Sequence, residues 1–177
     1  MRIIAGTLGG RVFDAPKGNH THPMSDKIRG ALFSVLGELD DLTVLDAFAG
    51  SGALSFEAVS RGATAVTALE NDRTAQDTIT KNIKTLGVEK QVKLTKAAAG
   101  AWSSTQENAR FDVVLCDPPY DDLQVSTLTT LTKHVKTDGI MALSWPGNQE
   151  PPQFDGLVQI VRKQYGDAQL VFYQKIL

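Results

Sequence analysis

The sequence of 177 residues has a single cysteine, Cys116, and no apolar run that approaches the roughly 20 residues a membrane helix needs. A lone cysteine excludes an internal disulfide and any zinc site built on paired cysteines. The opening MRIIAGTLGG also lacks the basic start and apolar core of a secretory signal. We therefore expect a soluble protein of the cytoplasm that makes no contact with a membrane.

Histidine is scarce as well, and His20, His22 and His134 are too scattered to indicate a metal site. With 42% hydrophobic and 21% charged residues, the composition is that of a globular domain, which excludes a disordered or fibrous protein. The net charge of −2 argues against a protein that coats nucleic acid indiscriminately. The charge is uneven, because residues 1–37 hold five Lys or Arg against two Asp.

From residue 42 onward, short apolar runs alternate with amphipathic stretches, which is typical of strand and helix units around a parallel sheet. We expect an α/β fold with helices on both faces of the sheet and an antiparallel pair of strands at its end. The expected strands are Thr43–Phe48, Ala65–Glu70, Gln91–Thr95, Phe111–Cys116, Ile140–Ser144, Leu157–Gln164 and Gln169–Ile176. The expected helices are Ala53–Ser60, Arg73–Leu86, Ala101–Asn108 and Gln124–Val135.

The first 40 residues do not follow this alternation. Arg2–Gly6 and Arg11–Ala15 flank a glycine-containing turn and predict a β-hairpin. Ser25 and Asp26 then begin an amphipathic helix that Gly37 is suited to end. We divide the chain into an N-terminal extension, residues 1–40, and a main domain, residues 41–177.

A glycine turn follows the first strand of the main domain and is the strongest local signal. Its candidate ligand-binding residues are Asp46, Phe48, Gly50, Ser51 and Gly52. Such a turn lets the backbone approach a nucleotide-like ligand at the carboxyl edge of the sheet. The dinucleotide pattern requires a third glycine where Ser55 stands, so the sequence disfavours pyrophosphate binding.

The second strand ends in Glu70, 18 residues after Gly52, and Asn71 follows it. An acidic residue at this place can accept hydrogen bonds from two ribose hydroxyls. By itself, such a glutamate more often caps a helix or faces solvent. Together with the glycine turn, Glu70 and Asn71 become candidate cofactor contacts.

The fourth strand delivers Asp117, Pro118, Pro119 and Tyr120. Two successive prolines fix an extended, rigid segment directly after a buried strand. A carboxylate and fixed carbonyl acceptors can bind an exocyclic amine while Tyr120 stacks on the ring that carries it. Cys116, which precedes them inside an apolar strand, is expected to be a buried thiol rather than a nucleophile.

These motifs resemble those of S-adenosylmethionine-dependent amino methyltransferases with the seven-stranded, Rossmann-like fold. The N-terminal block Arg2–Gly6, Gly10-Arg11 and His22–Arg29, leading to Ala31–Phe33, is similar to the bacterial ribosomal RNA small-subunit methyltransferase D family. Three departures stand out: His22-Pro23-Met24 replaces Arg-Pro-Thr, Gly30 replaces a glutamate, and Ala97–Ala99 lacks the acid or amide that faces adenine in the family.

The resemblance implies methyl transfer from S-adenosylmethionine to guanine N2 in 16S ribosomal RNA, with S-adenosylhomocysteine as product and no metal. Asp117 and the Pro118 carbonyl would then accept the N2 hydrogens, with Pro119 and Tyr120 completing the catalytic motif. We expect a monomer that acts on the small ribosomal subunit. The candidate RNA contacts are Arg2, Arg11, Lys27 and Arg29.

Three other functions compete with this interpretation. Asp-Pro-Pro-Tyr also serves methylation of adenine N6 in DNA or RNA, although no separate target-recognition domain is evident. A non-catalytic RNA-binding or ribosome assembly factor would retain the fold, but the loss of Asp46, Glu70 or Asp117 that would favour it is not observed. A nicotinamide oxidoreductase is disfavoured by Ser55.

Overall fold

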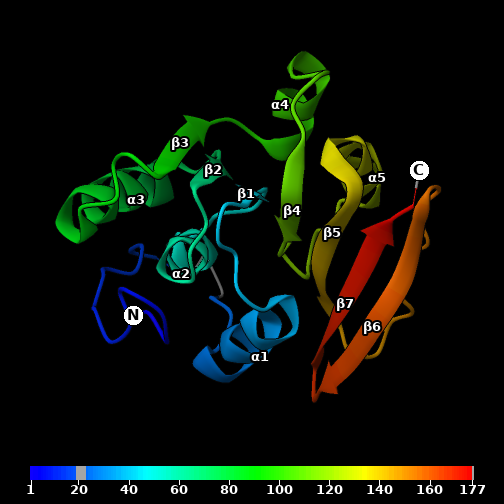
Figure 1. Cartoon of the computed structure of the whole chain (residues 1–177), viewed down its shortest axis with the longest axis horizontal. Coiled ribbons are helices and arrows are strands. Elements are labelled where there is room, and N and C mark those ends of the chain that lie inside the picture. Colours follow the sequence, from blue (N-terminus) through cyan, green and yellow to red (C-terminus); the bar gives the residue numbers. More distant parts are fainter. Residues whose placement is uncertain (19–22, 177) are drawn as a thin grey trace.

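Seven strands form one sheet in the computed structural model, which describes residues 1–18 and 23–176 (Figure 1). The sheet order is β3-β2-β1-β4-β5-β7-β6. The first five strands in this order run parallel to one another, and β7 runs antiparallel to both of its neighbours, β5 and β6. The strands are β1 (Thr43–Asp46), β2 (Ala65–Glu70), β3 (Val92–Lys96), β4 (Phe111–Cys116), β5 (Val135–Pro146), β6 (Leu157–Tyr165) and β7 (Ala168–Lys175). The predicted fold class is confirmed.

Helices cover both faces of the sheet. One face carries α1 (Asp26–Leu36), α2 (Ala53–Ser60) and α3 (Arg73–Leu86), and the other carries α4 (Ala99–Thr105), α5 (Val125–Leu131) and the short 3-10 helix η1 (Thr132–His134). Side chains of neighbouring strand residues alternate between the two cores, so Val44 packs toward α2 while Leu45 packs toward α4 and α5. Of the helices within the described ranges, none is long and apolar enough to cross a membrane.

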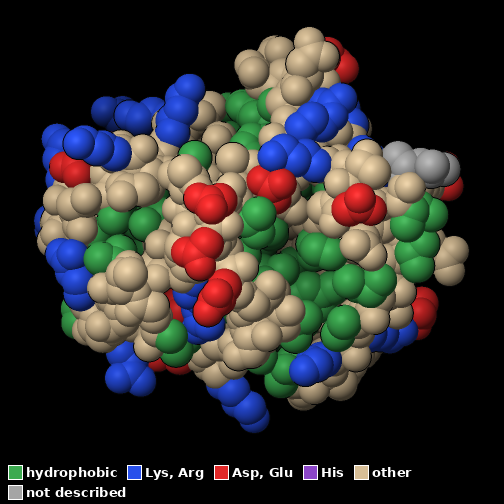
Figure 2. Space-filling model, viewed as in Figure 1, with side chains coloured by type: hydrophobic (Ala, Val, Ile, Leu, Met, Phe, Trp, Pro, Cys, Tyr) green, Lys and Arg blue, Asp and Glu red, His purple; other side chains and the backbone are tan. Residues whose placement is uncertain are grey.

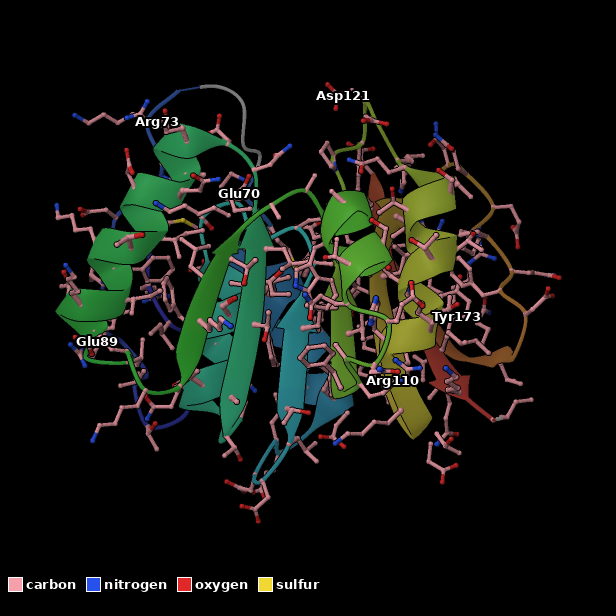
Figure 3. The ribbon with its side chains drawn as sticks, turned by 90° about the horizontal axis from the view of Figure 1, so that it is seen from above. Glu70, Arg73, Glu89, Arg110, Asp121 and Tyr173 are labelled. Carbon is pink, nitrogen blue, oxygen red and sulfur yellow. The ribbon has the colours of Figure 1, made fainter. Side chains whose placement is uncertain are left out.

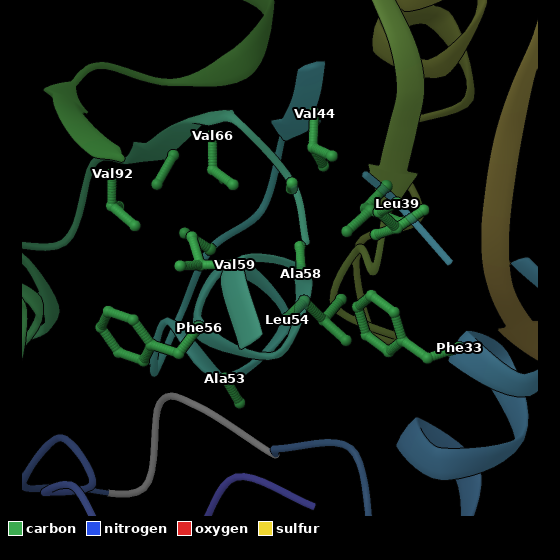
Figure 4. Packing of buried hydrophobic residues seen from close by; sticks show 14 of the residues in the cluster. Phe33, Leu39, Val44, Ala53, Leu54, Phe56, Ala58, Val59, Val66 and Val92 are labelled. Atoms are coloured by element: carbon green, nitrogen blue, oxygen red, sulfur yellow. The ribbon is translucent and has the colours of Figure 1, made fainter. Parts of the chain in front are cut away.

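Helix α2 is buried along its whole length, which is unusual for a helix of a small domain. Figure 4 shows Leu54, Ala58 and Val59 of this helix among strand valines on one side and Phe33 of α1 on the other. The helix therefore lies between the sheet and the N-terminal extension. Its first turn is consequently fixed in position directly after the glycine turn.

The N-terminal arms meet antiparallel, as expected, but their pairing is limited to one bridge between Arg2 and Val12. The backbone amides that a longer hairpin would use bind α2 instead: Ile4 and Ala5 donate to the Glu57 carboxylate at 2.9 and 3.2 Å. Gly6 has φ +84°, and a Cβ there would overlap the Ser60 carbonyl oxygen. The extension is thus shaped by contact with α2 as well as by its own pairing, in which the Ile3 and Phe13 amides donate to the Arg11 and Met1 carbonyls.

Other element boundaries differ from the sequence predictions by a few residues. Strand β5 begins at Val135 rather than Ile140, because Val135 pairs with Phe111 of β4 ahead of an irregularity in the register. The helix expected over Gln124–Val135 consequently ends earlier, as α5 followed by η1. Helix α4 begins two residues before the predicted Ala101.

Candidate functional site

A cavity of about 780 Å³ lies at the carboxyl edge of the parallel strands, within the usual size range of ligand sites. Figure 3 places Glu70 and Asp121 at this edge and Glu89 and Arg110 at the opposite one. Most of the predicted site residues line the cavity, namely Phe48, Gly50, Ser51, Glu70, Asn71, Asp117, Pro118, Pro119 and Tyr120. The ends of β1, β2 and β4 therefore bring them together, as parallel strands allow.

Two glycines give the turn after β1 its shape. Gly50 and Gly52 have φ of +54° and +82°, a region that side chains other than glycine rarely adopt. A Cβ on Gly52 would also lie 2.7 Å from the Phe56 ring. The chain can therefore turn sharply into α2 only with glycine at this place.

Glu70 holds this turn against β2. Its carboxylate accepts a hydrogen bond from the Gly50 amide at 2.7 Å and one from the Asp72 amide at 2.8 Å. A carboxylate offers about four lone-pair directions, so two remain for hydroxyl donors in the cavity. The geometry suits an acid that orients a vicinal diol.

Asp46 lies fully buried behind the turn, and Gly52 likewise does not line the cavity. Ser55 Oγ donates to Asp46 Oδ2 at 2.7 Å, while Oδ1 has no partner among the residues described. Burial, together with the nearby Asp117 and Glu70 carboxylates, raises the pKa of Asp46 to about 7. A cationic ligand nearby would favour its ionised form.

Asp117 precedes the two prolines in the sequence, and Tyr120 follows them. Burial raises the pKa of Asp117 to about 6, and the nearby Ser144 hydroxyl opposes this rise. The Tyr120 hydroxyl lies 2.7 Å from Ser144 Oγ and donates to the Trp145 carbonyl at 3.1 Å. Tyr120 as a whole is 41% exposed, so its hydroxyl end is fixed while the residue remains accessible for stacking.

The charged residues that line the cavity, among those described, are all acidic. Its lining includes Glu70, Asp72, Asp117 and Asp121, and no Lys or Arg is present among the described lining residues. Such a lining favours a ligand with positive charge and disfavours a pyrophosphate. The nicotinamide alternative therefore gains no support from the site.

Other lining residues were not recognised from the sequence. Pro23, Met24, Ser25 and Ile28 bring the start of α1 to the cavity, although only the helix itself was predicted. Ser144 also lines it, and a serine inside an apolar strand carries no distinguishing sequence signal. Ala97–Ala99 line it too, so no polar side chain from that stretch can meet an adenine.

The four candidate RNA contacts have different surroundings. The prediction for Arg29 needs correction, because its side chain is 1% exposed and pairs with Asp26 at 3.0 Å. Arg11 is exposed, but its guanidinium donates to the carbonyls at the end of α3 at 3.0 Å. Arg2 pairs with Asp26 at 3.3 Å, and Lys27 is exposed without an ion pair to any described residue.

Positive charge also gathers outside the N-terminal extension. Figure 2 shows Lys and Arg side chains over the α3 and β3 side of the molecule, whereas hydrophobic side chains gather toward β7 and β6. Arg73, Lys81, Lys84 and Lys93 are exposed on these elements. The sequence analysis did not anticipate this basic side, because its charges come from two separate elements.

The remaining cysteine and histidine residues lie away from this chemistry. Cys116 is buried, and burial raises the pKa of its thiol. His134 is buried between Ser103 and the Ala109 carbonyl, each 2.8 Å from a ring nitrogen. His20 and His22 lie outside the described residues. Within the described residues, no three His, Cys, Asp or Glu side chains gather into a possible metal site.

Known proteins resemble this chain over two thirds of its length or more, among them the following three. YlbH of Bacillus subtilis, provisionally named an rRNA methyltransferase, is 32% identical over 99% of both chains. Ribosomal RNA small subunit methyltransferase D of Haemophilus influenzae is 36% identical over 68% of this chain and 64% of its own. The solved structure of yhhF from Escherichia coli, provisionally described as a methyltransferase, has a TM-score of 0.88 at 28% identity, covering 99% of this chain and 98% of its own. A family model described as conserved hypothetical protein 95 matches residues 1–174.

Proposed function

Because this chain belongs to the ribosomal RNA small-subunit methyltransferase D family, we propose that it transfers a methyl group from S-adenosylmethionine to guanine N2 in 16S ribosomal RNA. The observation that carries this proposal is Asp117-Pro118-Pro119-Tyr120 at the wall of a cavity lined by carboxylates. An amine acceptor needs hydrogen-bond acceptors beside it, and a sulfonium donor needs negative charge.

The cofactor side of the cavity is formed by the glycine turn and Glu70. The free lone pairs of Glu70 suit the ribose hydroxyls. The Asp46 carboxylate, buried behind the turn and outside the cavity lining, adds negative charge that favours a cationic ligand. S-adenosylmethionine supplies an electrophilic methyl group bound to a sulfonium. Adenine is held by Phe48, by Asn71 and by backbone groups near Ala98, because the stretch Ala97–Ala99 has no polar side chain.

The target amine is a weak nucleophile, because its lone pair is delocalised into the guanine ring. Asp117 and the Pro118 carbonyl accept its two hydrogens, which orients the lone pair and stabilises the positive charge that develops on nitrogen. Asp117 then takes the proton released from that nitrogen. Tyr120 stacks on the base after the base has left its RNA loop.

The substrate is 16S ribosomal RNA in the small ribosomal subunit, and the protein acts on it as a monomer in the cytoplasm. Lys27 lies in the first turn of α1, between the lining residues Ser25 and Ile28. We expect its exposed ammonium, together with Arg2, to contact phosphates of the RNA. Arg29 is not part of this proposed surface, because its side chain is buried.

The deciding experiment is transfer of labelled methyl from S-adenosylmethionine to undermethylated small subunits, naked 16S ribosomal RNA and duplex DNA, followed by nucleoside identification. We expect label in N2-methylguanosine, abolished by Asp117→Asn and retained by Asp138→Asn at the opposite edge of the sheet. Label in N6-methyladenine would replace the proposed substrate while preserving the role of the motif. Cofactor binding without label on any of the three substrates would contradict the proposal.

A further inference from the structure

We propose that Ser55 is a positioning residue that holds the Asp46 carboxylate in its charged form behind the glycine turn, and thereby favours the cationic S-adenosylmethionine over its neutral product. The inference rests on the proposed function, because it takes S-adenosylmethionine as the methyl donor. It gives a role to the residue that stands where the dinucleotide pattern has its third glycine.

Ser55 and Asp46 meet where strand β1 ends and helix α2 begins. Ser55 is the third residue of α2, and its hydroxyl donates to Asp46 Oδ2 at 2.7 Å. Both residues are fully buried. Among the described residues, no other side chain donates to this carboxylate, and Oδ1 has no hydrogen-bond partner. The Ser55 hydroxyl is therefore the side-chain group that stabilises the ionised form of Asp46.

The other titratable groups near Asp46 oppose its ionisation. Glu70 at the end of β2 and Asp117 after β4 add negative charge, and Cys116 of β4 is a buried thiol. No ion pair joins Asp46 to a Lys or Arg within the described part of the chain. A cationic ligand in the cavity therefore supplies the positive charge that the chain itself does not place beside this carboxylate.

Asp46 acts on a ligand through its charge rather than through contact. The three residues that follow it, 47–49, line the cavity, whereas Asp46 itself does not. S-adenosylmethionine and S-adenosylhomocysteine share their adenosine and amino acid parts and differ by the methyl group and the positive charge of the sulfonium. A buried negative charge attracts the cationic ligand, and the protein interior screens this attraction weakly. The charge of Asp46 therefore changes the ratio of the two affinities, whereas a deformed turn lowers both.

Removal of the Ser55 hydroxyl should keep Asp46 protonated to higher pH. We expect Ser55→Ala to raise the titration midpoint of Asp46 by about one pH unit, because a buried carboxylate loses a hydrogen-bond donor. Burial holds the pKa of Asp46 at about 7 in the wild type, so the ionised fraction at pH 7 falls from about one half to about one tenth. The affinity for S-adenosylmethionine relative to S-adenosylhomocysteine should then fall by about fivefold. At about pH 9 Asp46 is ionised in both proteins, and the ratio should return to the wild-type value.

Two further substitutions separate this effect from damage to the helix. Ser60→Ala removes a buried hydroxyl at the far end of α2, which accepts from the Leu8 amide at 2.9 Å, and should leave the affinity ratio unchanged. Asp46→Asn removes the charge, so the ratio should be low at every pH. Addition of Ser55→Ala to Asp46→Asn should change the ratio no further, because Ser55 acts through Asp46.

The measurement is calorimetric titration of each protein with both ligands at several pH values between 6 and 9. Comparison of each variant with the wild type at the same pH cancels the titration of the ligand itself. A ratio that falls in Ser55→Ala at pH 7 and recovers at pH 9 supports the inference. An unchanged ratio at pH 7, or an equal loss at both pH values, would overturn it.

A second substitution covers the case in which Ser55→Ala does not fold. Ser55→Cys keeps nearly the same shape but offers a weaker donor. It should lower the affinity ratio at pH 7 in the same direction by a smaller factor. An unchanged ratio in Ser55→Cys would then count against the role of Ser55.

Carboxyl-carbon NMR of the ligand-free protein with labelled aspartate provides a second readout. The Asp46 signal is identified by its loss in Asp46→Asn, and its midpoint should rise in Ser55→Ala. A wild-type protein that binds neither ligand would contradict the proposed function but would leave this titration to decide on Ser55. An unchanged midpoint would overturn the inference while the proposed function stands, so the two failures are distinguishable.

Discussion

Arg29 Nε lies 3.8 Å from Glu57 Oε2, and both side chains are buried between α1 and α2. Glu57 also accepts from Arg61 at 3.0 Å, and a second nitrogen of Arg29 donates to the Arg2 carbonyl at 2.6 Å. This pair therefore joins α1, α2 and the first strand-like arm of the extension. Its position also fixes the first turn of α1 beside the cavity.

Replacing Arg29 by Met should lower the free energy of unfolding by about 3 kcal/mol, because it leaves a buried carboxylate with one charge partner fewer. Urea denaturation of the purified protein measures this loss. Lys27→Met, two residues earlier and exposed, is the control and should change stability by less than about 0.5 kcal/mol. Equal stability of the two variants would contradict the structural role of Arg29.

Lys27 should instead affect RNA affinity. We expect Lys27→Ala to reduce by about one the slope of log affinity against log salt concentration, because one phosphate contact is lost. Filter binding or fluorescence titration at several salt concentrations measures the slope. Lys90→Ala is a matched control, because Lys90 follows Glu89 at the edge opposite the cavity (Figure 3). A slope that Lys27→Ala leaves unchanged would exclude this contact.

The sequence predicted the placement of the cavity-lining motifs because each follows a parallel strand directly. The order along the chain then determines that Gly50, Glu70 and Asp117 reach the same edge, whatever the distant contacts are. The burial of Arg29 could not be predicted in this way. It depends on α1 docking against α2, which brings together residues that are 28 positions apart.

Contacts of the N-terminal hairpin and of Ser144 likewise could not be predicted from the local sequence. The pattern of Arg2–Gly6 favours a strand, but the Ile4 and Ala5 amides donate to Glu57 of α2, a contact that no local sequence pattern predicts. Ser144 faces Tyr120 only because of the register between β4 and β5. Contacts set by tertiary docking or by register are therefore the part of the site that required the structure.

The raised pKa of Asp46 predicts a pH dependence of stability. In the unfolded chain this carboxyl ionises near its ordinary value of 3.8, whereas in the fold it holds its proton up to about pH 7. The folded state therefore binds more protons between these values, and the free energy of unfolding should fall as pH rises from about 4 to 7. Asp46→Asn removes this contribution, so its stability should fall less between pH 5 and pH 7.5.

Urea denaturation at these two pH values tests the prediction, with Asp117→Asn as the comparison. Asp117, whose pKa is raised to about 6, contributes in the same direction over a narrower range. The two variants therefore separate the contributions of the two carboxyls. An identical pH dependence in wild type and Asp46→Asn would show that Asp46 is already ionised in the fold at pH 5.

Gly52→Ala should weaken cofactor binding by deforming the turn. The added Cβ would lie 2.7 Å from Phe56, and alanine is strained at φ +82°, so the turn must open or α2 must shift. Together these effects cost about 1–3 kcal/mol, which corresponds to a loss of roughly 5-fold to 150-fold in affinity if the free variant relaxes the turn and must restore it to bind the ligand. Calorimetric titration with S-adenosylhomocysteine measures the affinity. Gly87→Ala, also at positive φ but with open space around its Cβ, is the matched control and should lose stability without losing affinity.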